Sequence, residues 1–316
     1  MRLSTLDLKN IQKTSPMSAR VLFGINWDTE IPVFDEKNDL TPDIDPDYVF
    51  DDSVTKSVLA GFLYNRRVLL QGLHGTGKST HIEQVAARLN WPCLRINLDG
   101  HITRFDLLGK DVIHLQNEHP ISAFQEGILP WSIRHPVALV LDEYDAARPE
   151  VLFVLQRLLE QTGKLTLLDE NIVLDPHPYF RLFATTNTLG LGDATGLYFG
   201  THPLNQGQMD RWNIVAHTSY LPFEKEINLV CAKTPFFQNP EGRVTVKSMV
   251  AFADLTRQGF QSGDIALPMS PRTVISWAQN SVIFGDIKES LTLSFLNRFE
   301  EQDKPLLEEY YQRAFG

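Results

Sequence analysis

The sequence has 316 residues, 43% hydrophobic and 22% charged, a composition typical of a globular protein with one large or two linked domains. A net charge of −10 argues against a partner held by bulk attraction to phosphate, without excluding a local basic groove. The chain has no run near the ~18 apolar residues of a membrane span, no secretory signal, and two cysteines that support neither disulfides nor a cysteine metal site. We therefore expect a cytoplasmic protein.

The N-terminal segment, residues 1–52, divides at about residue 27 into a part with weak periodicity and an acidic part. The acidic part, residues 28–52, holds ten acids, one lysine and three prolines. This composition predicts an extended, loosely packed lead-in, because proline interrupts helices and like charges repel. A solvated linker is the plainest interpretation of such a charge run.

From residue 53 the pattern changes to short apolar strands that alternate with amphipathic helices. We expect strands over five runs: Val68–Gln71, Cys93–Leu98, Val137–Leu141, Arg181–Thr186 and Asn213–His217. We expect helices over three runs: Val54–Tyr64, Lys78–Leu89 and Glu150–Gln161. This alternation predicts an α/β fold with a parallel five-stranded sheet flanked by helices.

Two hairpins are expected to interrupt this alternation. The first pairs Asp111–Leu115 with Ile121–Gln125, and the second pairs Lys164–Leu168 with Asn171–Leu174. The second is joined by residues 169–170, Asp-Glu, a dipeptide that two-residue turns do not favour. The first hairpin has a polar tip with apolar flanks, which suits a contact with a partner or the lining of a pore as well as a plain surface hairpin.

The strand signals fade after Pro222, and we expect three or four helices from there to the C-terminus. The clearest lies in MSPRTVISWAQN, where Ser270 is a good N-cap and Pro271 fits the first helical position. We place a domain boundary near residue 220. The expected parts are the N-terminal segment 1–52, an α/β domain over 53–220 and a small helical domain over 221–316.

The stretch GLHGTGKST fits the phosphate-loop pattern G-x-x-x-x-G-K-[ST] and lies between an expected strand and an expected helix, as that motif requires. Its glycines let the backbone approach phosphates closely, and the helix N-terminus adds partial positive charge. Lys78 is expected to reach the β- and γ-phosphates, and Ser79 to offer its hydroxyl oxygen to Mg²⁺. An ordinary glycine turn is the alternative, and His74 fits either a phosphate contact or solvent. The predicted nucleotide-binding residues of the loop are Gly72, Leu73, His74, Gly75, Thr76, Gly77, Lys78, Ser79 and Thr80.

Two adjacent acids follow the third expected strand, in the run PVALVLDEYD. A buried strand that ends in unpaired charges is uncommon, because such charges are costly in a core. Beside a phosphate loop they have a use: Asp142 can hold Mg²⁺ through water, and Glu143 can orient and polarise the attacking water. The alternative is a surface turn that carries acids.

Three further polar residues fit the same site. Asn187 ends the run RLFATTN, where its amide can position water beside the γ-phosphate, although asparagine at a strand end is often a turn former. Arg211 precedes the fifth expected strand, and Arg272 lies at the start of a helix in the second domain. Arginine binds phosphate oxygens with a planar fork and can stabilise transition-state charge from outside a pocket. A surface salt bridge is the alternative for each arginine.

The order of these features resembles that of the AAA+ ATPases. GLHGTGKS is similar to their Walker A loop and ALVLDE to their Walker B strand, while Asn187, Arg211 and Arg272 match sensor 1, the arginine finger and sensor 2. The paired hairpins and the sequences QMDR and SPRT resemble the MoxR branch. Longer stretches, such as EGILPWSIRHPVALVLDEYDAARPEVLFVLQRLLE, are similar to the small ATPase subunits of aerobic cobaltochelatase, the CobS type. The similarity covers nearly the whole chain, most specifically residues 30–310.

The resemblance implies an AAA+ P-loop core with a helical lid, ATP and Mg²⁺ as cofactors, and a homo-oligomeric ring, expected to be a hexamer. It implies two partners: a second ring-forming subunit with a metal-ion-adhesion type domain, and a large subunit that holds the corrin. Together they insert Co²⁺ into hydrogenobyrinic acid a,c-diamide in cobalamin (vitamin B12) biosynthesis. The nine histidines of this chain are scattered without cobalt-ligand spacing, so we expect cobalt and corrin to bind elsewhere.

The resemblance also implies roles for residues outside the loop and the strand ends. Arg211 is expected to enter the site of a neighbouring subunit, and Arg272 to link the lid to the γ-phosphate. Tyr48 and Phe50 lie where related ATPases contact adenine, although a hydrophobic anchor for the acidic lead-in is an equally good interpretation.

Two other functions compete with an ATPase subunit of a cobalt chelatase. A MoxR-type AAA+ chaperone that remodels or activates another metal-dependent protein would share every catalytic residue, so the whole-chain resemblance is what favours the chelatase. A nucleic-acid ATPase is disfavoured by the net charge and by the absence of a dense Lys/Arg tract.

Overall fold

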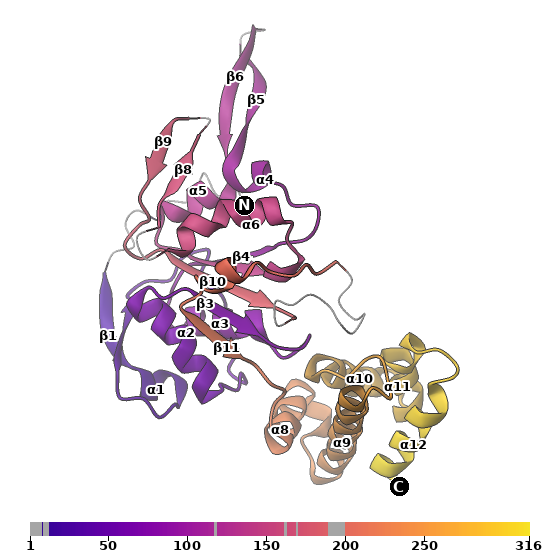
Figure 1. Ribbon diagram of the computed structural model, residues 1–316. Helices are drawn as coiled ribbons and strands as arrows, with labels where there is room; N and C mark the ends of the chain where they lie inside the picture. Colours follow the sequence, from indigo (N-terminus) through magenta and orange to yellow (C-terminus); the bar gives the residue numbers. More distant parts are fainter. Residues whose placement is uncertain (1–7, 9–12, 117–118, 161–162, 169, 189–199) are drawn as a thin grey trace. The chain divides into compact units, whose positions relative to one another are not determined.

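The computed structural model describes residues 8, 13–116, 119–160, 163–168, 170–188 and 200–316 (Figure 1). The chain forms two compact units. The first holds most of the chain up to Thr218, and the second holds Ser219–Gly316 together with two short pieces, Pro46–Val49 and Leu73–Thr76. Among the helices that the structure describes, none combines the length and the apolar character needed to cross a lipid bilayer.

The first unit is built on a five-stranded parallel sheet in the order β11-β3-β10-β7-β4. Its strands are β3 (Val68–Gln71), β4 (Cys93–Asn97), β7 (Ala138–Asp142), β10 (Arg181–Thr186) and β11 (Ile214–His217). All five were expected from the sequence, and each observed boundary lies within one residue of the expected one. The predicted parallel five-stranded sheet is therefore confirmed.

Both faces of the three central strands, β3, β7 and β10, are buried, as their apolar composition requires, while the edge strands β4 and β11 are partly exposed. Val140 and Phe183 pack with helices α2 (Asp52–Tyr64) and α3 (Lys78–Arg88) in one cluster. Their strand neighbours, such as Leu139, point to the opposite face, because side chains alternate along a strand. On that opposite face the apolar cluster includes residues of α5 (Ile128–Ile133) and α6 (Pro149–Gln156), so helices cover both sides of the sheet.

The helix expected over Glu150–Gln161 is shorter than the sequence pattern indicated. The α-helical part, α6, ends at Gln156, and the chain tightens into the 3-10 turn η3 (Arg157–Leu159). Leu158 and Leu159 are nevertheless buried, so the apolar periodicity continues past the point where α-helical hydrogen bonding stops. Other short helices of this unit include α4 (Arg104–Leu108), η2 (Tyr144–Ala146) and α7 (Gln206–Met209).

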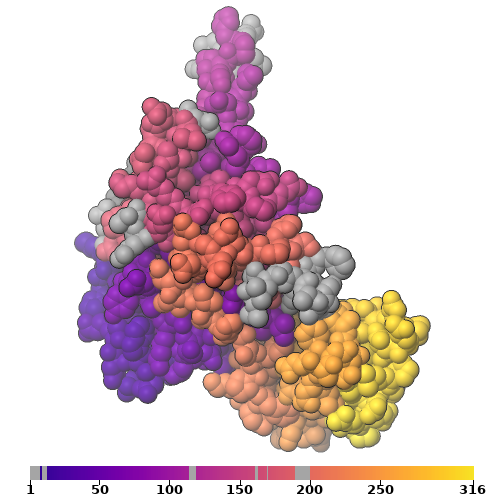
Figure 2. All heavy atoms as spheres, viewed as in Figure 1, coloured from indigo at the N-terminus to yellow at the C-terminus, as the bar shows by residue number. Residues whose placement is uncertain are grey.

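Both expected hairpins are present, and the first is longer than predicted. Strands β5 (Gly109–Gln116) and β6 (His119–Glu126) form a ribbon that projects from the body of its own unit (Figures 1 and 2). The second hairpin pairs β8 (Leu165–Leu167) with β9 (Ile172–Leu174). Each predicted strand of this hairpin extends one residue too far toward the turn. The Asn171 amide donates to the Leu168 carbonyl at 3.2 Å across the expected turn, and Asn171 has a left-handed φ of 54° that asparagine tolerates; Asp169 of that turn lies outside the described residues.

The prediction of a loosely packed N-terminal lead-in is also wrong for part of its length. Strand β1 (Thr14–Ser18) pairs antiparallel with β2 (Glu30–Phe34), and the short helix α1 (Ala19–Phe23) follows β1. Within β2, Ile31 and Phe34 are completely buried in the core of the first unit. The acidic character of residues 28–52 concealed these apolar anchors, since charge dominates the composition of the stretch.

The second unit is helical, with five α-helices in its fully described stretch 219–316 where the sequence indicated three or four. They are α8 (Phe223–Lys233), α9 (Pro240–Ser262), α10 (Pro271–Phe284), α11 (Ile287–Ser294) and α12 (Lys304–Phe315), with 3-10 turns η4 (Pro235–Phe237) and η5 (Leu296–Arg298). They enclose a separate apolar core around Phe252, Trp277 and Phe295. As expected, Ser270 caps α10 by accepting a hydrogen bond from the amide of Thr273 at 3.3 Å.

A buried histidine in α3 makes the stability of the first unit sensitive to pH. His81 is 5% exposed, and its Nε2 lies 3.0 Å from the hydroxyl oxygen of Thr55. Burial lowers the pKa of His81 to about 4, against a smaller opposing effect of Asp51. Its unfolded pKa is near ~6.5, so below that pH the unfolded chain takes up a proton that the folded chain does not.

We therefore predict that the free energy of unfolding falls by about 2 kcal/mol because of His81 when the pH drops from 7 to 5. His81→Gln should remove that part of the pH dependence in urea unfolding. The exposed His101 is the matched control, since His101→Gln should leave the dependence unchanged. An unaltered pH dependence in His81→Gln would show that this histidine is not the sensitive group.

Candidate nucleotide site

The predicted phosphate loop connects the end of β3 to the start of α3. Gly77 is the N-cap of α3 and has a φ of 84°, a left-handed conformation that glycine adopts without steric cost. The first amides of a helix lack intrahelical acceptors, so they present partial positive charge at this point of the loop. The geometry is that of an anion-binding helix start.

Lys78 joins the loop to the neighbouring strand β10. It is 7% exposed, and its Nζ donates hydrogen bonds to the Gly72 carbonyl at 2.7 Å and to Asn187 Oδ1 at 2.9 Å. Asn187 follows β10, which lies beside β3 in the sheet. The structure thus brings together two predicted site residues that are 109 positions apart in the sequence.

Asp142 is the last residue of β7 and is 6% exposed. The Ser79 hydroxyl donates to its Oδ1 at 2.6 Å, the Thr185 hydroxyl donates to the same oxygen, and Arg95 Nε donates to Oδ2 at 2.8 Å. Burial alone would raise the pKa of this carboxyl. The hydrogen bonds from Ser79 and Thr185 and the charge of Arg95 outweigh burial and hold the pKa below its usual range.

The Ser79 hydroxyl and the Asp142 carboxylate form the oxygen pair that was predicted to serve magnesium. Mg²⁺ prefers oxygen ligands and keeps several of its waters, so it needs few groups from the protein. The short distance between Ser79 Oγ and Asp142 Oδ1 and the ionised state of the carboxylate both fit this requirement. These residues would therefore suit a magnesium ion, which would supply positive charge to phosphate oxygens.

Glu143 occupies a strained backbone position directly after β7. Its φ is 56°, in the left-handed region that costs a residue other than glycine about 1–3 kcal/mol. Its backbone amide donates to the Thr185 hydroxyl at 3.2 Å, which ties this turn to β10. Strained positions held by their surroundings cluster at functional sites, so the backbone geometry supports a chemical role for Glu143.

Sequence reasoning missed Asp145, two residues after Glu143 in η2. This side chain is completely buried, and its Oδ2 accepts hydrogen bonds from the amides of Asn187, at 3.1 Å, and Thr188, at 2.9 Å, and from the Thr188 hydroxyl, at 2.7 Å. Asp145 thereby fixes the backbone from which the Asn187 amide reaches Lys78. Asp145 is visible in the sequence as a third acid in LDEYD. Its role becomes clear only from its hydrogen bonds to Asn187 and Thr188, which follow β10.

Two more residues at Asp142 were not foreseen. Thr185 accepts the Glu143 amide hydrogen bond and donates to Asp142, so it holds both acids. Arg95, on β4, pairs with Asp142 and lies 3.8 Å from Glu83 of α3. Nothing local in the sequence marks either residue, because their partners are reached only through the strand order.

The two predicted arginines lie in different units. Arg211 follows α7 in the first unit, where its Nη1 donates to the Gly207 carbonyl at 2.5 Å and its Nε lies 3.8 Å from Glu160. Arg272 is the second residue of α10 in the second unit and is exposed. Both positions leave the predicted roles toward phosphate untested, so these roles stay predictions.

The remaining predicted contacts also stay predictions. Phe50 packs edge-on against Phe23, with 5.1 Å between ring centroids, and the Arg88 guanidinium lies 4.6 Å from its ring. These contacts favour the hydrophobic-anchor interpretation of Phe50. Tyr48 packs within the second unit, and Thr80 lies half-buried on α3.

Comparisons with known proteins agree with this geometry. Residues 67–197 match the AAA domain of the dynein-related subfamily. The aerobic cobaltochelatase subunit CobS of Sinorhizobium sp. is 56% identical over 311 residues, which cover 98% of this chain and 93% of that protein. Midasin of Dictyostelium discoideum is 31% identical over 213 residues, 67% of this chain and 3% of midasin. The AAA match and the parallel sheet confirm the predicted fold class.

Solved structures give more distant likenesses. A putative ATPase from Cytophaga hutchinsonii has a TM-score of 0.44 and 18% identity, over 82% of this chain and 78% of that one. The RuvB Holliday junction branch migration motor of Thermotoga maritima has a TM-score of 0.48 and 14% identity, over 80% of this chain and 72% of that one.

We predict that Asp145→Asn lowers the turnover number of ATP hydrolysis by about 10-fold, because loss of the carboxylate charge weakens the three hydrogen bonds that Oδ2 accepts and lets the Asn187 amide shift. The dissociation constant for ATP should change far less. Asp28, a 79% exposed acid of the same unit, is the matched control, and Asp28→Asn should leave turnover unchanged. Turnover of Asp145→Asn within twofold of wild type would contradict a positioning role for Asp145.

Proposed function

This chain belongs to the CobS family of aerobic cobaltochelatase subunits, and we propose that it is the subunit whose ATP hydrolysis drives cobalt insertion into the corrin. The observation that carries the proposal is the 56% identity, which extends over nearly the full length of both chains and so includes the lid as well as the ATPase core. We propose hydrogenobyrinic acid a,c-diamide as the acceptor of Co²⁺, in cobalamin biosynthesis in the cytoplasm.

The contacts at the carboxyl edge of the sheet support a separate role for each site residue in ATP hydrolysis. Lys78 would neutralise charge on the β- and γ-phosphates, and the loop amides would hold their oxygens. Magnesium, when bound by Ser79 and Asp142, supplies positive charge to the phosphate oxygens. Glu143 would take a proton from the attacking water, and Asn187, held by Lys78 and Asp145, would orient that water.

We further propose that the active form is a homo-oligomeric ring, a hexamer, in which Arg211 serves the site of a neighbouring subunit. Arginine suits this role because its fork binds phosphate oxygens from outside a pocket. Arg272, at the start of α10, would sense the γ-phosphate through the lid. The proposed chelatase complex contains two further subunits: a second ring-forming subunit with a metal-ion-adhesion type domain, and a large subunit that holds the corrin.

Reconstitution tests the function as a whole. The chain is combined with candidate corrin-binding and adhesion-domain subunits, and cobalt uptake is followed by the absorbance of the corrin. We predict that uptake requires ATP and that Glu143→Gln lowers uptake and hydrolysis by at least about 10²-fold while ATP still binds, since glutamine keeps the size but loses the charge.

The matched control for this experiment is Glu150→Gln, an exposed acid at the start of α6 that should leave uptake unchanged. Full cobalt uptake with Glu143→Gln would refute the proposed chemistry. ATP hydrolysis without cobalt uptake, with every partner combination, would favour the chaperone function of the MoxR type.

A mixing experiment tests whether Arg211 acts on a neighbour. Arg211→Ala and Lys78→Ala chains are each expected to hydrolyse ATP poorly when alone. Mixed in equal amounts, they should regain measurable activity, because some interfaces would combine an intact loop with an intact arginine. Normal hydrolysis by Arg211→Ala alone would contradict the role.

A further inference from the structure

We infer that Tyr220 is a positioning residue for the phosphate loop, held in place by a buried ion pair between Arg257 and Glu226. This inference rests on the proposed ATPase function, because it concerns the loop that is proposed to hold the phosphates of ATP. The support comes from the second unit, which we call the lid unit. All the residues that carry it, including the loop tip Leu73–Thr76, pack within the second unit.

The ion pair joins helices α8 and α9 in the interior of the second unit. The Arg257 side chain is 7% exposed and that of Glu226 is completely buried. Arg257 Nη1 donates to Glu226 Oε2 at 2.8 Å and Nη2 donates to Oε1 at 2.7 Å, a two-point contact that fixes the guanidinium plane. Asp254 accepts a further hydrogen bond from Nη1 at 2.9 Å.

The same guanidinium holds the chain that leads into α10. Arg257 Nε donates to the Met269 carbonyl at 2.9 Å, and the Thr256 hydroxyl accepts from the Met269 amide at 3.0 Å. Both polar groups of the Met269 backbone are therefore bound by adjacent residues of α9. Met269 precedes Ser270, the N-cap of α10, so the start of the helix that carries Arg272 is clamped to α9.

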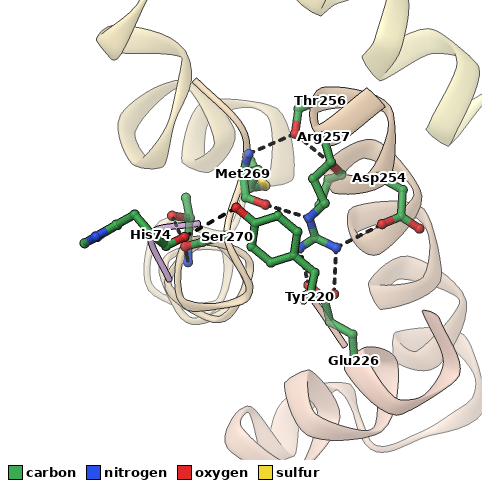
Figure 3. Close-up of polar contacts among 10 residues, drawn as sticks. His74, Tyr220, Glu226, Asp254, Thr256, Arg257, Met269 and Ser270 are labelled. Atoms are coloured by element: carbon green, nitrogen blue, oxygen red, sulfur yellow. Dashed lines mark hydrogen bonds and ion pairs between the residues drawn. The ribbon is translucent and has the colours of Figure 1, made fainter. Parts of the chain in front are cut away.

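Tyr220 lies against this clamp and reaches the loop (Figure 3). The Arg257 guanidinium carbon is 4.3 Å from the centroid of the Tyr220 ring, within the range of a cation–π contact. The Tyr220 hydroxyl donates to the carbonyl oxygen of His74 at 3.3 Å. One aromatic side chain thus connects the buried ion pair to a backbone group of the phosphate loop.

A second contact places the loop tip against the start of α10. Gly75 has a φ of 78°, and a Cβ at this position would come within 2.4 Å of Ser270 Cβ. The peptide between His74 and Gly75 therefore lies against both the Tyr220 hydroxyl and the N-cap of α10. Because the loop amides are the groups proposed to hold phosphate, a shift of Tyr220 or of the N-cap would change how well they do so.

Core filling alone does not explain the ion pair. Well-packed apolar residues of similar volume often stabilise a protein as much as a buried ion pair does. What an apolar group could not supply is the fixed direction of each contact: two hydrogen bonds to Glu226, one to Met269 and the ring of Tyr220. This directional arrangement indicates positioning rather than bulk stability.

Tyr220→Phe tests the inference, because it removes the hydroxyl and keeps the ring on Arg257. We expect a fluorescent N-methylanthraniloyl-ADP to dissociate about 3- to 10-fold faster, as for loss of one hydrogen bond, with KM for ATP raised similarly and kcat changed less than twofold. The melting temperature should stay at the wild-type value. The matched control is Tyr311→Phe, a partly buried lid tyrosine on α12, which should change none of these quantities.

Hydrogen exchange in the nucleotide-free protein gives a second readout that does not depend on ATPase activity. The amides of residues 73–76 should exchange faster in Tyr220→Phe than in wild type. Wild-type dissociation rate and wild-type exchange in Tyr220→Phe would overturn the inference while leaving the ATPase function standing. If the wild-type chain bound no nucleotide but the exchange difference were present, the proposed function would fail and the support of the loop would stand.

Discussion

The site depends on the hydrogen bonds that hold nearly buried charged groups at the carboxyl edge of the sheet. Lys78 and Asp142 are nearly buried, and a buried charge is tolerated only when it is paired and hydrogen-bonded. The strand order satisfies this condition, since β10 lies between β3 and β7 and brings Thr185 and Asn187 to the ends of both neighbours. A strand order that separated β10 from either neighbour would remove the Asn187 contact of Lys78 or the Thr185 contact of Asp142.

The same condition shapes the lid unit. Arg257 and Glu226 are paired deep inside a helical core, and the pair is aligned by the backbone of Met269 and the ring of Tyr220. In both units, the hydrogen bonds of buried charged groups hold one helix or strand against another. The phosphate loop contributes residues to both units, with Gly72 and Gly77 in the first and Leu73–Thr76 in the second.

Much of the α/β framework could be predicted from the sequence, because a strand buried on both faces is an uninterrupted apolar run bounded by polar residues. The phosphate loop could be predicted for a related reason, since its glycines and Lys78 form a local pattern. What failed depended on distant partners. The antiparallel pairing of β1 with β2 is set by residues buried in the core, such as Phe34.

The missed site residues have the same explanation. Asp145, Thr185 and Arg95 have no local motif, and each acquires its function from a strand or helix far away in the sequence. Tyr220 contacts a loop residue that is 146 positions earlier. Periodicity identifies elements, but it does not reveal which side chains meet once the sheet order is fixed.

Equilibrium binding of a fluorescent, non-hydrolysable ATP analogue, with and without magnesium, tests the central claim most directly. The account predicts that the wild-type chain binds the analogue more tightly with magnesium, that Lys78→Ala abolishes binding, and that Asp142→Asn removes the effect of magnesium. Binding by folded Lys78→Ala at wild-type affinity, or a folded wild-type chain that shows no magnesium-dependent binding, would contradict it.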